Sequence, residues 1–174
     1  MKKLLLLSDL WGLQQSEWIQ LYQSNLQDHF EITIYDICQL GEIDLSKYEA
    51  KAIHDQFING KMDLAVNTLI QKEKSSVGIL AFSMGATIAW KAIQKGLKAD
   101  FLYAISATRL RYETEAVNSQ VTLIYGKNDP YRPDKECLKH LQLKAQLIPN
   151  QGHELYRQKL IATKISTVII KNHH

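Results

Sequence analysis

The sequence has little cysteine and no long hydrophobic run. Its 174 residues contain two cysteines, Cys38 and Cys137, which lie outside any C-x-x-C or Cys/His ligand spacing. We therefore expect reduced thiols in a cytoplasmic protein rather than a disulfide scaffold or a zinc site. The apolar run Leu4 to Leu7 stops at Ser8 and is shorter than the roughly 7 to 15 residues of a secretion-signal core. No stretch approaches the roughly 20 apolar residues of a membrane span.

An excess of charge of one sign is also missing. The chain has 21 Lys and Arg against 18 Asp and Glu, a formal charge of +3, and the basic residues are scattered. This balance predicts neither a nucleic-acid partner nor a membrane partner. Repeats, low-complexity segments and linkers rich in Pro, Gly or Ser are absent as well. With 45% hydrophobic residues, the chain is expected to form a single domain, residues 1–174, around a substantial core.

Short apolar, often β-branched runs alternate with longer amphipathic stretches, which is typical of βα units wound into a parallel sheet. Strands are predicted at roughly Lys3–Ser8, Glu31–Asp36, Val77–Phe82, Phe101–Ser106, Val121–Tyr125 and Ala145–Ile148. Helices are predicted at Ser16–Asp28, Met62–Lys74, Met84–Gly96, Asp134–Leu141 and Glu154–Val168. The predicted fold class is α/β, a three-layer α/β/α sandwich with a mostly parallel sheet of about six strands and no cap domain. Residues 39–59 lack periodicity and are predicted to cross the surface as a long irregular loop.

A buried-strand pattern runs directly into Ser83 and then into a helix of small residues. The segment reads Gly78-Ile79-Leu80-Ala81-Phe82-Ser83-Met84-Gly85-Ala86. A nucleophilic serine on a sharp strand-to-helix turn needs small residues two positions before and two positions after it, and Ala81 and Gly85 meet that need. The common motif has Gly at both positions, so Ala81 departs from it by one methyl group. The alternative is that Ser83 is an ordinary helix N-cap.

A single acid follows the strand predicted at Val121–Tyr125. Asp129 lies in the turn Gly126-Lys127-Asn128-Asp129-Pro130. At the carboxyl end of a parallel strand it can reach the same rim of the sheet as Ser83, where it would orient and stabilise a protonated imidazole. The alternative is an Asx-turn that shapes the loop ahead of Pro130.

A Gly-His pair after the last predicted strand offers a base. His153 follows a polar turn and precedes the last predicted helix. Ser83, Asp129 and His153 thus occur in the chain order serine, acid, histidine. The other histidines lack a comparable context and are predicted to be surface residues; they are His29, His54, His140, His173 and His174.

On these three segments, the chain resembles a compact member of the α/β-hydrolase superfamily over nearly its whole length. The resemblance implies a nucleophilic triad of Ser83, Asp129 and His153, with no metal or organic cofactor. A narrower resemblance rests on Trp11-Gly12 followed by Trp18, which is similar to the Trp-Gly-x5-Trp stretch of pimeloyl-carrier-protein methyl esterases and related carboxylesterases. The two tryptophans are equally suited to packing.

The resemblance also implies an oxyanion site built from backbone N–H groups. Met84 would supply one donor, and Leu10 or Trp11 the other, from the loop after the first strand. The superfamily often has a His-Gly pair in that loop, where this chain has Asp9-Leu10. An acidic Asp9 is expected either to shape the turn, which we favour, or to repel anionic substrates.

These features predict a serine hydrolase that cleaves a carboxylic ester or thioester of a small or externally presented acyl group through an acyl-Ser83 intermediate. Its partner would be a small-molecule substrate, with an acyl carrier as a further candidate. Residues 109–120 are too few for the lid that larger relatives insert there, so an open site is expected, with Arg109 and Arg111 either attracting an anionic tail or merely solvated. Two alternatives remain: a non-catalytic binding protein of the same fold, or a triad enzyme acting on lactones or C–C bonds.

Overall fold

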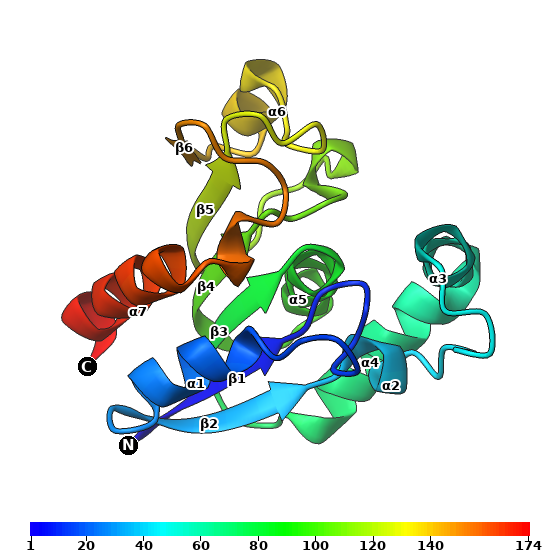
Figure 1. Ribbon diagram of the computed structural model, residues 1–174, viewed down its shortest axis with the longest axis horizontal. Helices are drawn as coiled ribbons and strands as arrows, with labels where there is room; N and C mark the ends of the chain where they lie inside the picture. The colour runs from blue at the N-terminus through cyan, green and yellow to red at the C-terminus, as the bar shows by residue number, and fades with distance from the viewer.

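Six parallel strands form one sheet at the centre of the computed structural model, which describes residues 1–174 (Figure 1). The order across the sheet is β2-β1-β3-β4-β5-β6, and every neighbouring pair runs parallel. The strands are β1 Lys2–Leu7, β2 Phe30–Tyr35, β3 Val77–Phe82, β4 Ala99–Ile105, β5 Gln120–Gly126 and β6 Ala145–Ile148. The predicted α/β sandwich with about six strands is confirmed, and its sheet is parallel throughout.

The sequence of the central strands reflects burial on both faces. All six residues of β3, Val-Gly-Ile-Leu-Ala-Phe, are buried. A parallel strand covered by helices on both sides reads as a continuous apolar run rather than as an alternating one. The edge strands β2 and β6 have only one neighbour each, and most of their residues are partly or fully exposed.

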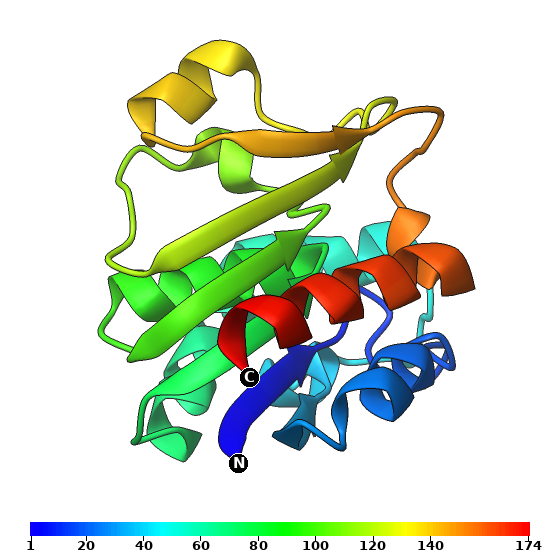
Figure 2. The same cartoon turned by 90° about the vertical axis from the view of Figure 1, so that its left-hand side faces the viewer.

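Helices cover both faces of the sheet (Figure 2). The helices are α1 Ile19–Leu26, α2 Ile37–Leu40, α3 Ala50–Gln56, α4 Met62–Lys72, α5 Met84–Gln94, α6 Lys135–His140 and α7 Lys159–His173. Because successive strand residues point to opposite faces, Leu4 and Leu6 of β1 pack with α1 and α7, whereas Leu5 and Leu7 pack with α4 and α5. The molecule therefore has two hydrophobic cores, one on each side of the sheet.

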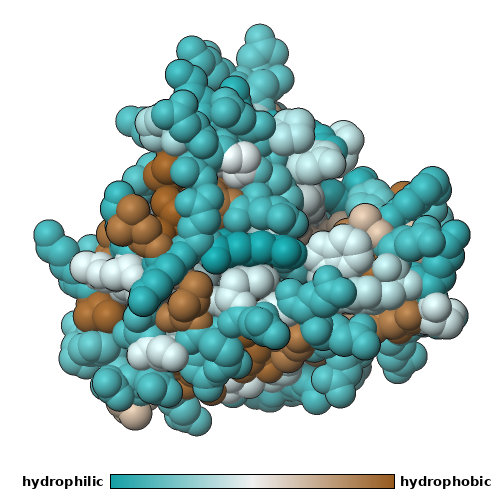
Figure 3. All heavy atoms as spheres, viewed as in Figure 1, coloured by the Kyte–Doolittle hydropathy of each residue, from teal (hydrophilic) through white to brown (hydrophobic).

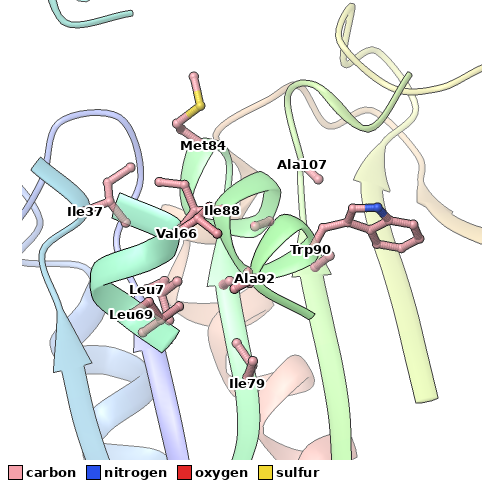
Figure 4. Close-up of a cluster of buried hydrophobic side chains, with 14 of the residues drawn as sticks. Leu7, Ile37, Val66, Leu69, Ile79, Met84, Ile88, Trp90, Ala92 and Ala107 are labelled. Atoms are coloured by element: carbon pink, nitrogen blue, oxygen red, sulfur yellow. The ribbon is translucent and has the colours of Figure 1, made fainter. Parts of the chain in front are cut away.

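Helix α5 lies directly on the sheet in the larger core (Figure 4). Its alanines, including Ala86, Ala89 and Ala92, are fully buried, and such small side chains let a helix approach the strands closely. Figure 4 shows Val66 and Leu69 of α4 beside this helix, so the two helices share one layer.

Residues 39–59 were predicted to form a long irregular loop, and this prediction is wrong. The segment contains the end of α2 and all of α3, and a kinked turn, Phe57–Lys61, with non-helical backbone at Asn59 and Gly60, joins α3 to α4. Helix α3 has seven residues and buries only Ile53, followed by Phe57 in the turn. A single buried position per turn over so short a helix leaves no readable period.

The last helix also differs from its prediction. It was expected to begin at Glu154, but α7 begins at Lys159 and continues to His173. Residues Leu155–Arg157 form a separate 3₁₀ turn. The extended backbone of Gln158 separates that turn from α7, and the side chains of Tyr156 and Arg157 in the turn bond to Asp9, near the other end of the chain.

The direction of chain progression reverses next to β1. From β1 the chain moves to β2 on one side, then returns to β3 on the other side and continues toward β6. In open α/β sheets ligands bind beyond the carboxyl ends of the strands at such a reversal. The loop after β1 and Ser83 after β3 both lie there.

No helix has the length and apolar character needed to cross a membrane.

Candidate active site

Ser83 occupies a strained turn between β3 and α5. Its backbone has φ +52° and ψ −117°, a conformation that non-glycine residues rarely adopt. The Ser83 N–H donates to the carbonyl of Ile105 at 2.8 Å, which holds the turn against β4. The side chain makes no capping bond to α5, so Ser83 does not act as a side-chain N-cap.

The positions two before and two after Ser83 have little room. A Cβ atom on Gly85 would lie 2.1 Å from the carbonyl oxygen of Ser8, so only glycine fits where α5 approaches the end of β1. Ala81 is fully buried in β3, and the sheet accommodates its methyl group. The departure from the common Gly motif at this position therefore leaves the turn intact.

The three predicted side chains form one hydrogen-bonded chain. Ser83 Oγ lies 2.9 Å from His153 Nε2, and His153 Nδ1 lies 2.8 Å from Asp129 Oδ2. With its proton on Nδ1, the imidazole donates to the carboxylate and accepts from the serine hydroxyl. The Asp129 carboxylate is completely buried, whereas the His153 ring retains 20% of its exposure.

Asp129 has two roles in its turn. Its Oδ1 accepts the backbone N–H of Tyr131 at 2.8 Å, which is the Asx-turn considered above, while Oδ2 faces His153. The two readings of this residue are therefore compatible. The ring of Tyr131 in turn packs edge-on to His153 with centroids 5.1 Å apart and limits the movement of the imidazole.

Asp9 is buried beneath the loop after β1. Its Oδ1 accepts the N–H of Trp11 at 3.1 Å, and its Oδ2 accepts from the Tyr156 hydroxyl at 3.0 Å and from Arg157 Nη2 at 2.8 Å. Burial alone lowers the pKa of the Arg157 guanidinium, but the hydrogen bond and charge of Asp9 outweigh burial and raise it. Asp9 shapes the turn, which is the alternative favoured above. Its pairing with Arg157 weakens the repulsion of anionic substrates that the other alternative requires.

The contacts of Asp9 separate the two candidates for the second oxyanion donor. The N–H of Trp11 is already bonded to Asp9, whereas the N–H of Leu10 donates no hydrogen bond within the protein. Met84 is the first residue of α5, where N–H groups have no acceptor inside the helix. Leu10, Met84 and Ser83 line the same pocket. Of the three predicted donors, Leu10 and Met84 therefore have a free backbone N–H next to Ser83, and Trp11 does not.

The two tryptophans near the N-terminus differ in position. The Trp11 side chain lines the pocket and packs edge-on to Tyr48 with centroids 5.3 Å apart. Trp18 is buried beneath the site, where its ring contacts Phe82 and Tyr156 at centroid distances of 4.7 and 4.8 Å. Trp18 therefore serves packing, and only Trp11 borders the space where a ligand could bind.

A pocket of about 520 Å³ opens beside Ser83. One wall comes from α3, through Ala50, Lys51 and His54, and the opposite wall comes from the segment after β4. In Figure 3 the surface is concave between the region of α3, on the right, and the part of the molecule above it. The pocket remains partly open, as expected from the short 109–120 segment, but α3 adds a wall that the sequence analysis did not anticipate.

Two sets of pocket residues escaped the sequence analysis. His54 was predicted to be an ordinary surface histidine, but it is half-buried in the wall formed by α3. Tyr131 and Tyr156 flank the His153 ring from two different loops. No local motif marks these residues. His54 and Tyr131 gain their places from contacts between distant segments, whereas Tyr156 lies three residues after His153.

The remaining candidate ligands and nucleophiles are placed unfavourably for chemistry. Burial, with smaller contributions from Asp36 and Asp9, raises the pKa of the Cys38 thiol to about 12, so this thiol is protonated near neutral pH. Both cysteines are free. No group of three or more His, Cys, Asp or Glu side chains is arranged to hold a metal ion.

No protein-family model and no curated protein matches the sequence. Similarity appears among solved structures. A Klebsiella pneumoniae protein assigned as a dienelactone hydrolase aligns with a TM-score of 0.70 and 11% identity over 99% of this chain and 88% of that one. The carboxylesterase CesB from Bacillus subtilis aligns with a TM-score of 0.64 and 10% identity over 99% and 84%.

A third structure has nearly the same length as this chain. It is a Xanthomonas campestris pv. campestris protein assigned to the alpha/beta superfamily of hydrolases, with a TM-score of 0.64 and 12% identity over 98% of both chains. At such identities the likeness concerns the fold, and it extends over almost the whole chain. The chain therefore has the fold of the α/β-hydrolase superfamily.

Proposed function

We propose that this protein is a serine hydrolase that cleaves carboxylic esters or thioesters of small acyl groups. The observation that carries the proposal is the hydrogen-bonded chain Ser83–His153–Asp129, which starts at a strained turn and ends in a buried carboxylate. An imidazole in this arrangement can accept the serine proton, and the carboxylate stabilises the imidazolium that forms. The pocket beside Ser83 provides room for the substrate.

In the first half of the reaction, Ser83 Oγ attacks the acyl carbon while His153 Nε2 takes the hydroxyl proton. The carbonyl oxygen becomes an oxyanion and accepts hydrogen bonds from the backbone N–H groups of Met84 and Leu10. His153 then returns the proton to the leaving alcohol or thiol, and an acyl-Ser83 ester remains. A water molecule, deprotonated by His153, attacks this ester and releases the acid by the same steps in reverse.

The replacement Ser83→Ala tests the proposal. It removes a hydroxyl that makes no structural bond except to His153, so the fold is expected to persist while hydrolysis of p-nitrophenyl butyrate falls at least about a thousandfold. Labelling by a fluorophosphonate probe, located by peptide mass spectrometry, is expected at Ser83 in the unmodified protein. Ser166→Ala is the matched control, because its buried hydroxyl on α7 has no hydrogen-bond partner and lies in the core away from the pocket.

The outcomes separate the alternatives. A folded protein that neither reacts with the probe nor hydrolyses any ester would be a binding protein of this fold, and the proposal would be wrong. Activity retained in Ser83→Ala would assign the nucleophile elsewhere. If the probe labels Ser83, rates on a panel of esters, thioesters, lactones and C–C substrates identify the bond that is cleaved.

A further inference from the structure

The two acidic groups that line the pocket both contact one basic side chain, Arg157. The carboxylates of Asp9 and Glu154 lie 2.8 and 3.4 Å from the guanidinium of Arg157. Of the basic residues in the lining, Lys51 pairs with Asp55 on the exposed side of α3. Arg109 and Arg111 form no ion pair. The pocket therefore contains two positive charges without a negative partner.

Aromatic rings hold these two guanidinium groups in position. The Arg109 and Arg111 guanidinium carbons lie 4.7 and 4.5 Å from the centre of the Tyr112 ring. Arg111 also donates from Nη1 to the carbonyl oxygens of Thr108 and Tyr131. The Arg109 side chain, by contrast, makes no hydrogen bond within the protein, so all its donors are free for a ligand.

Both arginines act on the opposite wall of the pocket. The pKa of His54 on α3 is lowered, first by burial and then by the charge of Arg109, with Arg111 and Lys51 adding to the effect against Asp55. The positive field of the two guanidinium groups thus reaches across the pocket to α3. An anion bound there would meet the positive charge of the two guanidinium groups from one wall and the His54 imidazole from the other.

The arginine segment is adjacent to the proposed nucleophile and base. The N–H of Thr108 lies 3.5 Å from the carbonyl oxygen of Ser83, and Arg111 bonds to the carbonyl of Tyr131, whose ring packs on His153. A substrate whose scissile carbonyl is at Ser83 can therefore place its remote end beside the two arginines within the same pocket.

We propose that the substrate has an anionic group, a carboxylate or a phosphate, remote from the scissile bond, and that Arg109 and Arg111 bind it beside α3. This inference rests on the proposed hydrolase function, and it names a substrate class for the same site. Guanidinium groups bind carboxylates and phosphates through paired, charge-assisted hydrogen bonds. The pairing of Asp9 with Arg157 offsets the charge of the buried carboxylate that would otherwise oppose such a ligand.

The test compares two esters of matched length, monomethyl adipate, which ends in a carboxylate, and methyl hexanoate, which ends in a methyl group. We expect kcat/KM, measured by acid release in a pH-stat, to favour the anionic ester about tenfold or more, the effect of one charge-assisted hydrogen bond. In Arg109→Gln this ratio is expected to fall by about the same factor. Arg132→Gln, an exposed arginine outside the pocket lining, is the matched control and should keep the ratio of the unmodified protein.

Inhibition distinguishes the two kinds of anion. Inorganic phosphate and acetate are each tested as competitive inhibitors of p-nitrophenyl butyrate hydrolysis. Stronger inhibition by phosphate that weakens in Arg109→Gln points to a phosphorylated substrate, and the reverse order points to a carboxylate. Arg109 is the position of choice because its side chain makes no hydrogen bond within the protein and does not contact the Tyr131 loop, which Arg111 holds.

A binding measurement separates failure of this inference from failure of the proposed function. Calorimetry on Ser83→Ala reports binding of monomethyl adipate and methyl hexanoate without turnover. Tighter binding of the anion that is lost in Ser83→Ala/Arg109→Gln supports the anionic subsite even if no ester is hydrolysed. Equal binding of the two esters, or a kcat/KM ratio that Arg109→Gln leaves unchanged, overturns it.

Discussion

Ser83 has a strained backbone conformation, and its hydroxyl forms a hydrogen bond with one side chain, that of His153. A non-glycine residue at φ +52° costs on the order of 1 to 3 kcal/mol, and the surrounding strands must supply that energy. The strain lifts Oγ away from the end of α5 and toward His153. The Asp129 carboxylate is also held in position, because one oxygen accepts a hydrogen bond within its own turn and the other bonds to the imidazole of His153.

Asp9 shows at the same scale how two loops are held together. We expect Asp9→Asn to lower the free energy of unfolding by about 2 kcal/mol, less than the loss of a fully buried pair because Arg157 is partly exposed. Hydrolysis of p-nitrophenyl butyrate should fall as well, because the Leu10 donor lies in the loop that Asp9 holds. Urea denaturation and initial rates measure both effects.

Glu154→Gln is the control for that measurement. Glu154 contacts the same guanidinium at 3.4 Å, but its side chain is 56% exposed. Exposed ion pairs contribute about 0 to 1 kcal/mol, so this change should have little effect on stability. Equal losses in the two variants would show that the charge of Arg157, rather than the buried contact with Asp9, is what matters.

At the scale of elements, the close approach of α5 to β1 brings the loop after β1 next to Ser83. Gly85 makes that approach possible, because any side chain there would meet the backbone of Ser8 and Leu7. Gly126 has the same role at the end of β5, where a Cβ atom would lie 2.2 Å from the carbonyl oxygen of Gln151 in the histidine loop. Two glycines thus bring three loops to one rim of the sheet.

We expect Gly85→Ala to destabilise the protein by about 1 to 3 kcal/mol, because the helix must shift to admit the methyl group. The matched control is Gly152→Ala, where a Cβ atom has no neighbour within 4 Å and φ is not positive. Its effect should stay within about 0.5 kcal/mol. Chemical denaturation measures both, and a Gly85→Ala protein as stable as the control would contradict the close packing of α5 on β1.

At the scale of the whole molecule, one wall of the pocket comes from α3, a short helix in the connection between β2 and β3 that does not lie against the sheet. Helix α3 stands at the edge of the molecule in Figure 1 and contributes Ala50, Lys51 and His54 to the pocket. The position of this wall is fixed by packing, because Ile53 and Phe57 are buried in the core that contains α4 and α5. Enclosure of the site thus depends on a connection between β2 and β3.

This wall predicts a limited chain-length preference for p-nitrophenyl esters. Each methylene that the pocket buries contributes about 0.8 kcal/mol, so kcat/KM should rise from acetate toward hexanoate and then level off when the chain leaves the pocket. Ala50→Trp adds bulk to the α3 wall and should move the plateau to shorter esters. Ala116→Trp, on the exposed 109–120 segment outside the pocket, should leave it in place.

The series from acetate to dodecanoate is measured with micelle formation controlled. A steady increase up to dodecanoate would contradict the prediction, since it would require that the protein enclose a longer chain than this pocket holds. If the plateau in kcat/KM stays at the same chain length in Ala50→Trp, α3 does not contact the acyl group.

The sheet and the three proposed catalytic residues could be predicted from the sequence because their signals are local. Continuous apolar runs such as β3 identify buried parallel strands, and Ser83, Asp129 and His153 each follow a strand. Parallel topology then brings the carboxyl ends of all strands to one rim of the sheet, so chain order alone places the three residues near one another.

The remaining features could not be predicted, because they depend on contacts between residues far apart in the chain. Arg157 pairs with Asp9 from 148 positions away and so compensates the buried carboxylate that accepts the N–H of Trp11. The pocket wall at His54 depends on how α3 docks on the core, and a seven-residue helix that buries one side chain has too little periodicity to reveal it. Local patterns record which face of an element is apolar, whereas the partner of a buried charge is determined only when distant segments pack together.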